Sequence, residues 1–487
     1  MTLTIIILYL CLVVAIGSLS HRLFRGTGED YFLASRSLGS FLLLMSLFGT
    51  NMTAFAILGA SGEAYHEGIG VFGLMASSSA LIIPLVFFFI GTRVWALGKR
   101  LGLLTQVQYF RQRWGSDALG LALFIILIAL LIPYLLIGVS GGGITLHQIT
   151  KGQVPEWVGG LLVCSVVMIY VCYGGLRGTA WANAFQTVVF VTLGGTAFFF
   201  ILQQHGGLLA AMKAVSASNP DLLIRGDHIK PLKLLTYTCI PLSVGMFPHM
   251  FMHWLTARRA ETFRVPLKLY PIFIAAVWVP SVTLGVIGRL DFPDLHGPAA
   301  NSILVRLIDL HAPEVLAGLL AAGVFAAVMS SLDSQVLSIG TMFTQDIVRH
   351  YGFREQMSER HQILYGRFFV CAVLVVTYVL SLTTDRSIFK LGVWSFTGFA
   401  ALFPLVVAAL FWRRSTKYGA AASLATVVCL WTYFFQLGWA TPGHTVGGAG
   451  IMPVAVILAG STLAMIIGSL LTRPPDESVI RRFFPQP

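Results

Sequence analysis

Charged residues are scarce in this chain of 487 residues: Asp, Glu, Lys and Arg together make up 11% of it, against about 25% in a soluble globular protein. A soluble chain of this length would divide into domains with polar surfaces. The GxxxxGK[ST] phosphate-binding motif is missing, which argues against direct coupling to ATP. The six cysteines lie within apolar stretches and form no metal-ligand cluster. The low charge therefore excludes a soluble globular class.

Long apolar runs take the place of polar surface. Hydrophobic residues make up 56% of the chain and the mean hydropathy is +0.81. A helix of about twenty apolar residues crosses the roughly 30 Å of hydrocarbon in a bilayer, and continuous runs exclude an alternating β-barrel pattern. We therefore predict an all-α membrane protein with about thirteen transmembrane helices. The runs lie near 2–20, 38–62, 71–92, 117–146, 156–174, 179–203, 234–256, 269–288, 313–345, 361–383, 388–412, 418–437 and 451–472.

The basic residues predict how the chain is oriented. The net charge of +12 is spread over short loops rather than one face, which does not suit a nucleic-acid partner. With the amino terminus outside, 23 of the 32 Lys and Arg fall in cytoplasmic segments, as the positive-inside rule requires. We expect a multi-pass protein of the cell membrane whose carboxyl-terminal tail, 473–487, lies in the cytoplasm.

The second run is polar at its centre, where Gly49, Thr50, Asn51 and Thr53 lie close together. Gly weakens a helix, and Thr and Asn compete for its backbone hydrogen bonds. Small residues also allow helices to pack closely in membranes, so a packing face is the alternative. We favour a broken helix at this point.

The seventh run has a similar interruption. Gly245 and Pro248 break its helical pattern, and His249 and His253 are ionisable residues within it. Transporters often contain two inverted repeats whose first helices are both broken. Because the two interrupted runs are five apart, we predict two five-helix repeats. The expected segments are one helix at the start, repeat one at 38–203, repeat two at 234–412, and two further helices at 418–472.

The ninth run contains Ser330, Ser331, Asp333 and Ser334 in an otherwise apolar stretch. Hydroxyl and carboxylate oxygens suit a hard monovalent cation. Each Ser could instead bond a carbonyl of its own helix. A carboxylate in mid-membrane costs at least ~2.5 kcal/mol to insert, so Asp333 needs a partner, a proton or a cation.

These motifs together resemble the sodium:solute symporter family, whose members take up sugars, proline, pantothenate, sialic acid and monocarboxylates. The resemblance covers nearly the whole chain. Its motifs are EDYFLASRSLGSF before the second run, the Asn51-Met52-Thr53 segment, YGGLRG at 173–178, PHMFMHWLTARR at 248–259, AAVMSSLDSQVLSIGTMFTQDI in the ninth run and ALFWRRSTKYGA at 409–420.

The resemblance implies a leucine-transporter-type fold and sodium-coupled symport of a small organic solute by alternating access. It implies a sodium ion between the second and ninth runs. The ligands would be carbonyls of Gly49, Met52 and Ala327 and hydroxyls of Ser330 and Ser331. The solute would bind near Asn51, Thr53 and Ala56, with His249 and His253 as further candidates.

Two departures from the family pattern suggest a second cation site. Many relatives carry an Asp in the sixth run, where this chain has Asn183. Conversely, Asp333 stands where relatives with a second sodium site often have Ser. We hypothesise that the carboxylate has moved to the opposite helix, so that Asp333, Ser334 and Asn183 form a cation or proton site. The alternative is that Asp333 pairs with a neighbour for packing.

Sequence alone leaves two other functions open. A proton-coupled carrier would use Asp333 or a histidine of the seventh run, and a transporter-like sensor would use the same fold without net transport. No nucleophile–base constellation indicates an enzyme, and no cofactor beyond the coupling sodium is expected. The expected partners are a small polar solute, sodium and the lipid bilayer.

Overall fold

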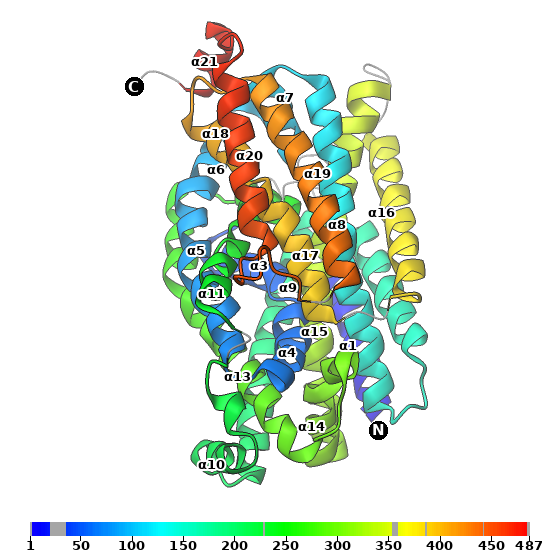
Figure 1. Ribbon diagram of the computed structural model, residues 1–487. Coiled ribbons are helices and arrows are strands. Elements are labelled where there is room, and N and C mark those ends of the chain that lie inside the picture. Colours follow the sequence, from blue (N-terminus) through cyan, green and yellow to red (C-terminus); the bar gives the residue numbers. More distant parts are fainter. Residues whose placement is uncertain are drawn as a thin grey trace.

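The computed structural model describes residues 2–19, 36–226, 229–352, 359–384, 387–441 and 443–484. The first seven residues of the EDYFLASRSLGSF motif and the basic residues Arg22, Arg25, Arg354 and Arg386 lie outside these ranges. The chain forms an elongated helical bundle in which the first helix begins at one end and the last helix lies at the other (Figure 1). Termini at opposite ends agree with an odd number of membrane crossings.

The first half of the chain contains helices that run to residue 218, joined by short π-helical segments. They are α1 (Thr2–Leu19), α3 (Ser40–Asn51), η3 (Phe55–Gly59), α4 (Ala60–Glu67), η4 (Phe72–Ala76), α5 (Ser77–Val86), η5 (Phe87–Gly91), α6 (Thr92–Leu101), α7 (Gln106–Trp114), α8 (Asp117–Ile149), α9 (Glu156–Gln204) and α10 (Leu208–Ser218).

The second half begins with short 3₁₀ turns and continues with long helices. They are η6 (Pro220–Leu223), α11 (Pro231–Tyr237), η7 (Ile240–Gly245), α12 (Pro248–Leu255), η8 (Ala260–Phe263), α13 (Arg264–Asp291), η9 (Gly297–Ser302), α14 (Ile303–His311), α15 (Glu314–Met342), η10 (Phe343–Gly352), α16 (Glu359–Ser381), α17 (Ile388–Ala401), α18 (Phe403–Phe411), α19 (Lys417–Ala440), α20 (Pro453–Leu470) and α21 (Glu477–Phe483).

Within the described residues, nine helices are long and apolar enough to cross a membrane, and eleven if each of two bent pairs is one span. Two more of the expected spans are present as shorter apolar helices, Thr2–Gly17 and Glu156–Cys172. The all-helical membrane class is therefore confirmed, whereas the count of thirteen stays a prediction.

The two broken spans occur where the sequence predicts them. Ser40–Asn51 and Phe55–Glu67 meet at 57°, and Pro231–Gly245 and Pro248–Leu255 meet at 51°. Pro248 occupies the first turn of α12, where its missing N–H costs no helical hydrogen bond. Both breaks leave backbone groups without helical partners in the middle of the bundle.

The expected spans 156–174 and 179–203 are present as two helices, Glu156–Cys172 and Gly175–Gln204, which meet at a kink. The label α9 covers both of them, because the chain passes from one to the other at Gly175 without a loop. Gly175 has φ +55° and ψ −160°, a conformation that side chains with a Cβ rarely adopt. The YGGLRG motif therefore supplies the kink between the two spans.

Helix α15 is the centre of the bundle. All of its residues from Leu320 to Met342 are buried, and it packs against α9, α8, α1 and α3. Its row of Ala, Gly and Ser residues lets these neighbours approach closely, as small residues do in membrane proteins. A polar group on α15 therefore faces protein on every side and must find its partner there.

The second half of the first broken span, in α4, lies against α13 with almost no space between the backbones. A Cβ added at Gly285 would lie 2.2 Å from the backbone oxygen of Ser61 in α4. A side chain could rotate away from such a clash, but a backbone oxygen can move only if the two helices separate.

We therefore expect Gly285→Ala to lower the free energy of unfolding by about 1–3 kcal/mol, as overpacking does. Gly194→Ala is the matched control, because a Cβ there meets nothing within 4 Å and the gain in helix propensity is the same. Thermal unfolding of the two purified variants tests this, and equal melting temperatures would contradict the close approach of α4 and α13.

Candidate functional site

The helix break between α3 and η3 exposes backbone oxygens inside the bundle. Helix α3 ends at Asn51, and Met52 is extended with φ −89° and ψ 94°. The hydroxyl of Thr53 then accepts a hydrogen bond from the Phe55 N–H at 2.9 Å, which helps the second half to start. The carbonyls of the last turn of α3, including that of Gly49, are left without helical partners.

Helix α15 supplies a hydroxyl to this break. The Ser330 hydroxyl donates to the Gly49 carbonyl at 2.9 Å and lies 3.1 Å from the Ala327 carbonyl. Three of the five predicted sodium ligands therefore lie in direct contact. The hydroxyl of Ser331, one residue on, donates to the Val328 carbonyl of its own helix at 3.1 Å. Met52 is buried at the break itself.

Gly49 lies close to α9 as well as to α15. A Cβ at this position would lie 2.2 Å from the Thr187 hydroxyl and 3.3 Å from the Asn183 carbonyl. The absence of a side chain thus allows three helices to meet at one carbonyl.

Asp333 lies in the same buried region but has different neighbours. Its Oδ2 accepts a hydrogen bond from the Tyr170 hydroxyl at 2.8 Å. Its Oδ1 is buried and has no hydrogen-bond partner within the described part of the chain. A buried carboxylate with one unsatisfied oxygen is costly unless a proton or a cation is bound there.

Ser334 links two of the residues selected from the sequence. Asn183 donates from Nδ2 to its hydroxyl at 2.8 Å, and His253 Nε2 lies 3.2 Å from the same oxygen. His253 therefore belongs to the polar cluster around Asn183 and Ser334, although the sequence suggested a place beside the solute. The Asn183 Oδ1 and His253 Nδ1 atoms are buried and lack partners among the described residues.

The sequence analysis did not identify three polar residues of this region. Tyr9 of α1 and Tyr170 of α9 have hydroxyls beside Gln186, which itself lies three residues after Asn183. The hydroxyl of Tyr9 and both polar atoms of Gln186 are buried without hydrogen-bond partners in the ranges described. The signal available in the sequence was the spacing of Asn183 and Gln186, which puts both on nearly one helix face.

A small cavity of about 30 Å³ borders the break. Of the residues predicted to bind the solute, Asn51 and Ala56 line this cavity, whereas Thr53, His249 and His253 are not among its lining residues. Most of its wall is apolar, and its polar members are Asn51, Ser79 and Ser243. Asn51 also donates from Nδ2 to the Tyr270 hydroxyl at 2.7 Å.

His249 lies one layer behind this cavity. Its ring stacks on Phe247, a lining residue, with 5.1 Å between centroids, and lies 5.7 Å from the ring of Tyr134. Both ring nitrogens are buried and lack hydrogen-bond partners in the described chain.

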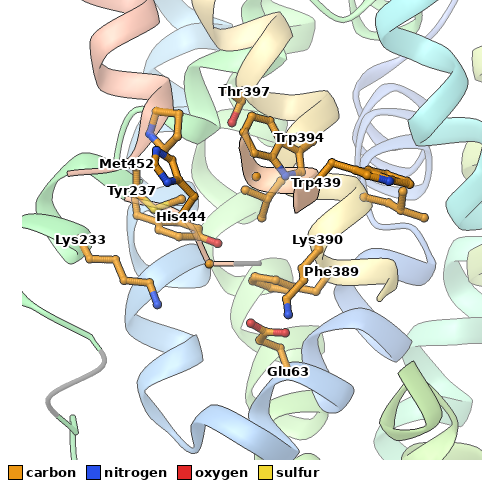
Figure 2. Close-up of a pocket in the computed structure, with 15 residues that line it drawn as sticks. Glu63, Lys233, Tyr237, Phe389, Lys390, Trp394, Thr397, Trp439, His444 and Met452 are labelled. Carbon is orange, nitrogen blue, oxygen red and sulfur yellow. The ribbon is translucent and has the colours of Figure 1, made fainter. Parts of the chain in front are cut away.

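A second cavity of about 100 Å³ opens beside α4 and has a charged lining. Figure 2 shows Glu63 with its carboxylate directed toward Lys390, and Lys233 on the opposite wall. Phe389 lines this cavity, and its ring stacks on Phe55 of the small cavity at 4.8 Å between centroids. One pair of aromatic rings thus separates the two cavities.

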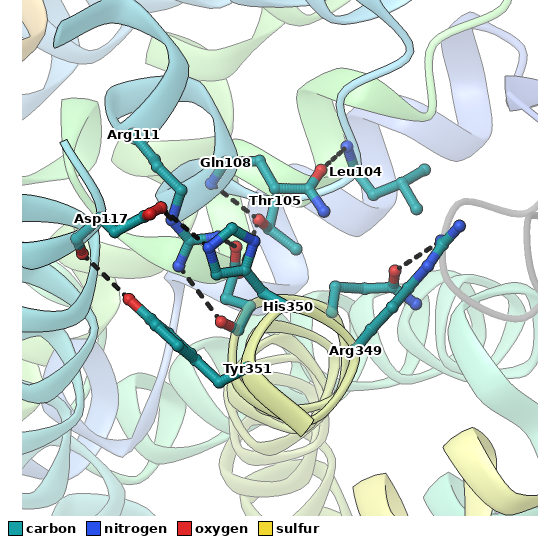
Figure 3. A network of polar contacts seen from close by, with 10 residues as sticks. Leu104, Thr105, Gln108, Arg111, Asp117, Arg349, His350 and Tyr351 are labelled. Atoms are coloured by element: carbon teal, nitrogen blue, oxygen red, sulfur yellow. Dashed lines mark hydrogen bonds and ion pairs between the residues drawn. The ribbon is translucent and has the colours of Figure 1, made fainter. Parts of the chain in front are cut away.

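The end of the bundle that carries α7 is held together by a network of polar contacts (Figure 3). Asp346 accepts hydrogen bonds from Thr105 at 2.7 Å and from Arg111 at 3.3 Å. Arg111 also lies 3.5 Å from the carboxylate of Asp117, which lies 2.8 Å from His350 as well. The network joins α7, the start of α8 and the extension of α15.

Arg113 of α7 fastens the same end to α18. It donates to the carbonyls of Ala409 and Trp412 at 3.1 and 3.0 Å and to the Ser415 hydroxyl at 2.9 Å. Burial lowers the pKa of Arg113 to about 10, so the guanidinium remains charged at neutral pH. A cation at the carboxyl end of α18 is favourable for the helix dipole.

Two bent spans that pack against a buried central helix are typical of secondary transporters. The sequence profile of the sodium:solute symporter family matches residues 31–426. The chain belongs to this family.

Curated relatives match over nearly their full length. The high-affinity proline transporter PutP of Bacillus subtilis (strain 168) is 24% identical, over 93% of this chain and 95% of the relative. The sodium/proline symporter of Escherichia coli (strain K12) is also 24% identical, over 93% and 90%.

Solved structures show the same fold at lower identity. A Na⁺-coupled sialic acid symporter in a substrate-bound outward-open state aligns with a TM-score of 0.81 at 15% identity, over 98% of this chain and 99% of the other. MhsT in complex with L-phenylalanine aligns with a TM-score of 0.56 at 12% identity, over 88% and 97%. The leucine-transporter-type fold expected from the sequence is confirmed, and the protein is a sodium-coupled symporter of a small organic solute.

Proposed function

We propose that the solute is a small zwitterionic amino acid of the proline class, bound at the break between α3 and η3. One observation carries this proposal: the cavity at the break is walled by aromatic rings, and none of the described residues that line it is charged. The proline transporters among the curated relatives support the same class of solute.

The cavity suits an apolar ring with charges at one side. Phe55, Phe247, Trp278 and Phe396 offer ring faces, and Asn51 marks the polar side. The η3 half begins at the break, so its N–H groups and helix dipole favour a carboxylate there. The end of α3 presents carbonyls, which favour an ammonium group and a sodium ion. The helix ends thus supply the complementary charge that the side chains lack.

The charged cavity beside α4 is the proposed entrance for the solute. Glu63, Lys233 and Lys390 present both signs of charge, which suits a zwitterion better than an anion or a cation. The stacked rings of Phe55 and Phe389 lie between this entrance and the cavity at the break. The cavity at the break, at about 30 Å³, has room for only a water molecule or two. Entry of the solute therefore requires the rings and the bent spans to move.

The coupling sodium is proposed to bind between Gly49, Met52, Ala327, Ser330 and Ser331. The direct contact between the Ser330 hydroxyl and the Gly49 carbonyl supports this set, since a cation there would coordinate both oxygens. Sodium would then link the broken span to α15, and the solute would bind beside it. Both ligands would depend on one arrangement of the helices, which is the origin of coupling. The proposed cycle contains no covalent step.

A second cation is proposed to bind at Asp333 with Asn183 and Ser334. The unsatisfied Asp333 Oδ1 and Asn183 Oδ1 atoms support this site, because oxygens that lack hydrogen-bond donors are free to coordinate a cation. Tyr170 would hold the carboxylate in place through its hydrogen bond to Oδ2. A proton at Asp333 is the competing occupant, and it would make the carrier partly proton-coupled.

The protein is proposed to lie in the cell membrane with its amino terminus outside. The end of the bundle that carries α7 and α21 would then face the cytoplasm (Figure 1). Arg100, Arg111 and Arg113 lie at that end, in agreement with the excess of basic residues expected on the inner side. The two bent spans begin repeat one, 38–203, and repeat two, 234–412, as proposed from the sequence.

The solute class can be tested by thermal unfolding of the purified protein. We expect L-proline to raise the melting temperature in sodium chloride and not in choline chloride, because only the sodium-bound protein has the complete site. D-glucose and sialic acid are the comparison solutes. Sodium-dependent stabilisation by either of these and not by proline would contradict the proposal.

Ser330→Ala is expected to raise the sodium concentration for half-maximal stabilisation at least about tenfold, because an interaction with a charged group contributes about 1.5–3 kcal/mol. Ser338→Ala is the matched control, since Ser338 is equally buried in α15 and its hydroxyl bonds only the Gln335 carbonyl, at 2.7 Å. If both variants keep the sodium dependence of the parent protein, the ion binds elsewhere.

Asp333→Asn tests the second site. We expect the Hill coefficient for sodium in gradient-driven uptake to fall to one, because a neutral amide binds the cation weakly. Tyr170→Phe keeps the carboxylate and should retain the coefficient with a lower affinity. If the sodium response of Asp333→Asn is unchanged but a proton gradient no longer accelerates uptake, Asp333 binds a proton instead. If neither the sodium response nor the proton response changes, Asp333 has a packing role, and it binds neither a second sodium ion nor a transported proton.

A further inference from the structure

A group of two histidines and one aspartate lies far from the helix breaks, at the end of the bundle where α1 begins (Figure 1). His205 directly follows α9, Asp291 is the last residue of α13, and His311 is the last residue of α14. Three separate helices thus end at one point. Neither the sodium site nor the solute cavity involves these residues.

The three side chains are close enough to share one ion. His311 Nε2 lies 2.8 Å and His205 Nε2 lies 3.2 Å from the same Asp291 oxygen, Oδ2. One ligand atom from each residue lies within 4.8 Å of the other two. In a tetrahedral zinc site with bonds of about 2.0–2.1 Å, neighbouring ligand atoms are about 3.3 Å apart. Two of the three separations are already near this value.

The donor set has the chemistry of a zinc site. Two imidazole nitrogens and a carboxylate oxygen are ligands that Zn²⁺ prefers, and a water molecule can complete a site with three protein ligands. The side chains are 13%, 17% and 16% exposed for His205, Asp291 and His311, so an ion from solution can reach them. The geometry around His205 also suits a metal better than a hydrogen bond: its Nε2 is buried and, although 3.2 Å from Asp291, makes no hydrogen bond within the described residues.

We propose that His205, Asp291 and His311 bind one zinc ion that ties together the ends of α9, α13 and α14. Helix α14 contacts α4 and η3, the second half of the broken span, and it also contacts α8, α9 and α15. It therefore bridges the element that must move for transport and the helices around it. Zinc fixes α14 to α9 and α13 and slows the opening of this end, a consequence that rests on the proposed function of the broken span.

Binding is tested first, and independently of transport, by calorimetric titration of the purified full-length protein with zinc chloride. We expect one zinc per chain with a dissociation constant in the micromolar range or below. His205→Ala and His311→Ala should each weaken binding at least tenfold, and Asp291→Asn by a smaller factor. His296→Ala is the matched control, because His296 is an exposed histidine in the connection between α13 and α14. No binding by the parent protein, or unchanged binding in His205→Ala and His311→Ala, would overturn the site.

The geometry and the effect on α14 have separate readouts. Cobalt bound in place of zinc should give the intense visible absorption of a tetrahedral ion in the parent protein and in His296→Ala, and not in His311→Ala. Zinc should slow hydrogen exchange of peptides that cover 200–207, 288–293 and 303–312 at least fivefold. Zinc binding without protection of these segments would overturn the proposed tie between the helices, and a failure of proline to bind would leave both readouts unaffected.

Discussion

The contact between the Ser330 hydroxyl and the Gly49 carbonyl is the interaction on which the architecture of the site depends. A break in a membrane helix releases backbone oxygens that water cannot reach, and each must be satisfied by a neighbour or an ion. Gly49 allows α9 and α15 to approach the break, and Ser330 meets the freed carbonyl. The same oxygens are then available to a cation, so a structural requirement and the proposed ion site coincide.

The surroundings of α15 explain why its polar residues are informative. Because α15 is buried on every side, each of its polar atoms either has a protein partner or requires an occupant. Ser330, Ser331 and Ser338 all bond carbonyls, whereas one oxygen of Asp333 has no partner among the described residues. The unsatisfied Asp333 oxygen therefore requires an occupant directly, whereas the Ser330 hydroxyl would have to exchange its bond to the Gly49 carbonyl for a bond to the proposed sodium ion.

Local sequence patterns were sufficient to predict the two helix breaks, because a break depends on the residues at that point of the chain. The polar centre of the run 38–62 and the Gly245–Pro248 interruption predicted both bends, because a helix breaks where its own residues disfavour it. Features built from distant segments were not predictable in this way. Tyr170 meets Asp333 only through the packing of α9 on α15, and His253 meets Ser334 only through the packing of α12 on α15. The separation of the two spans at 174–179, in contrast, was predictable from local sequence, because Gly175 interrupts the helix between them.

The stacked rings of Phe55 and Phe389 make the wall between the two cavities only one pair of aromatic rings thick. A barrier this thin can close a path, but a moving ring recognises little about the molecule that passes it. Discrimination between solutes must then occur in the charged mouth before the rings or in the uncharged cavity behind them. The rings set when a molecule crosses, and the chemistry on either side sets which molecule it is.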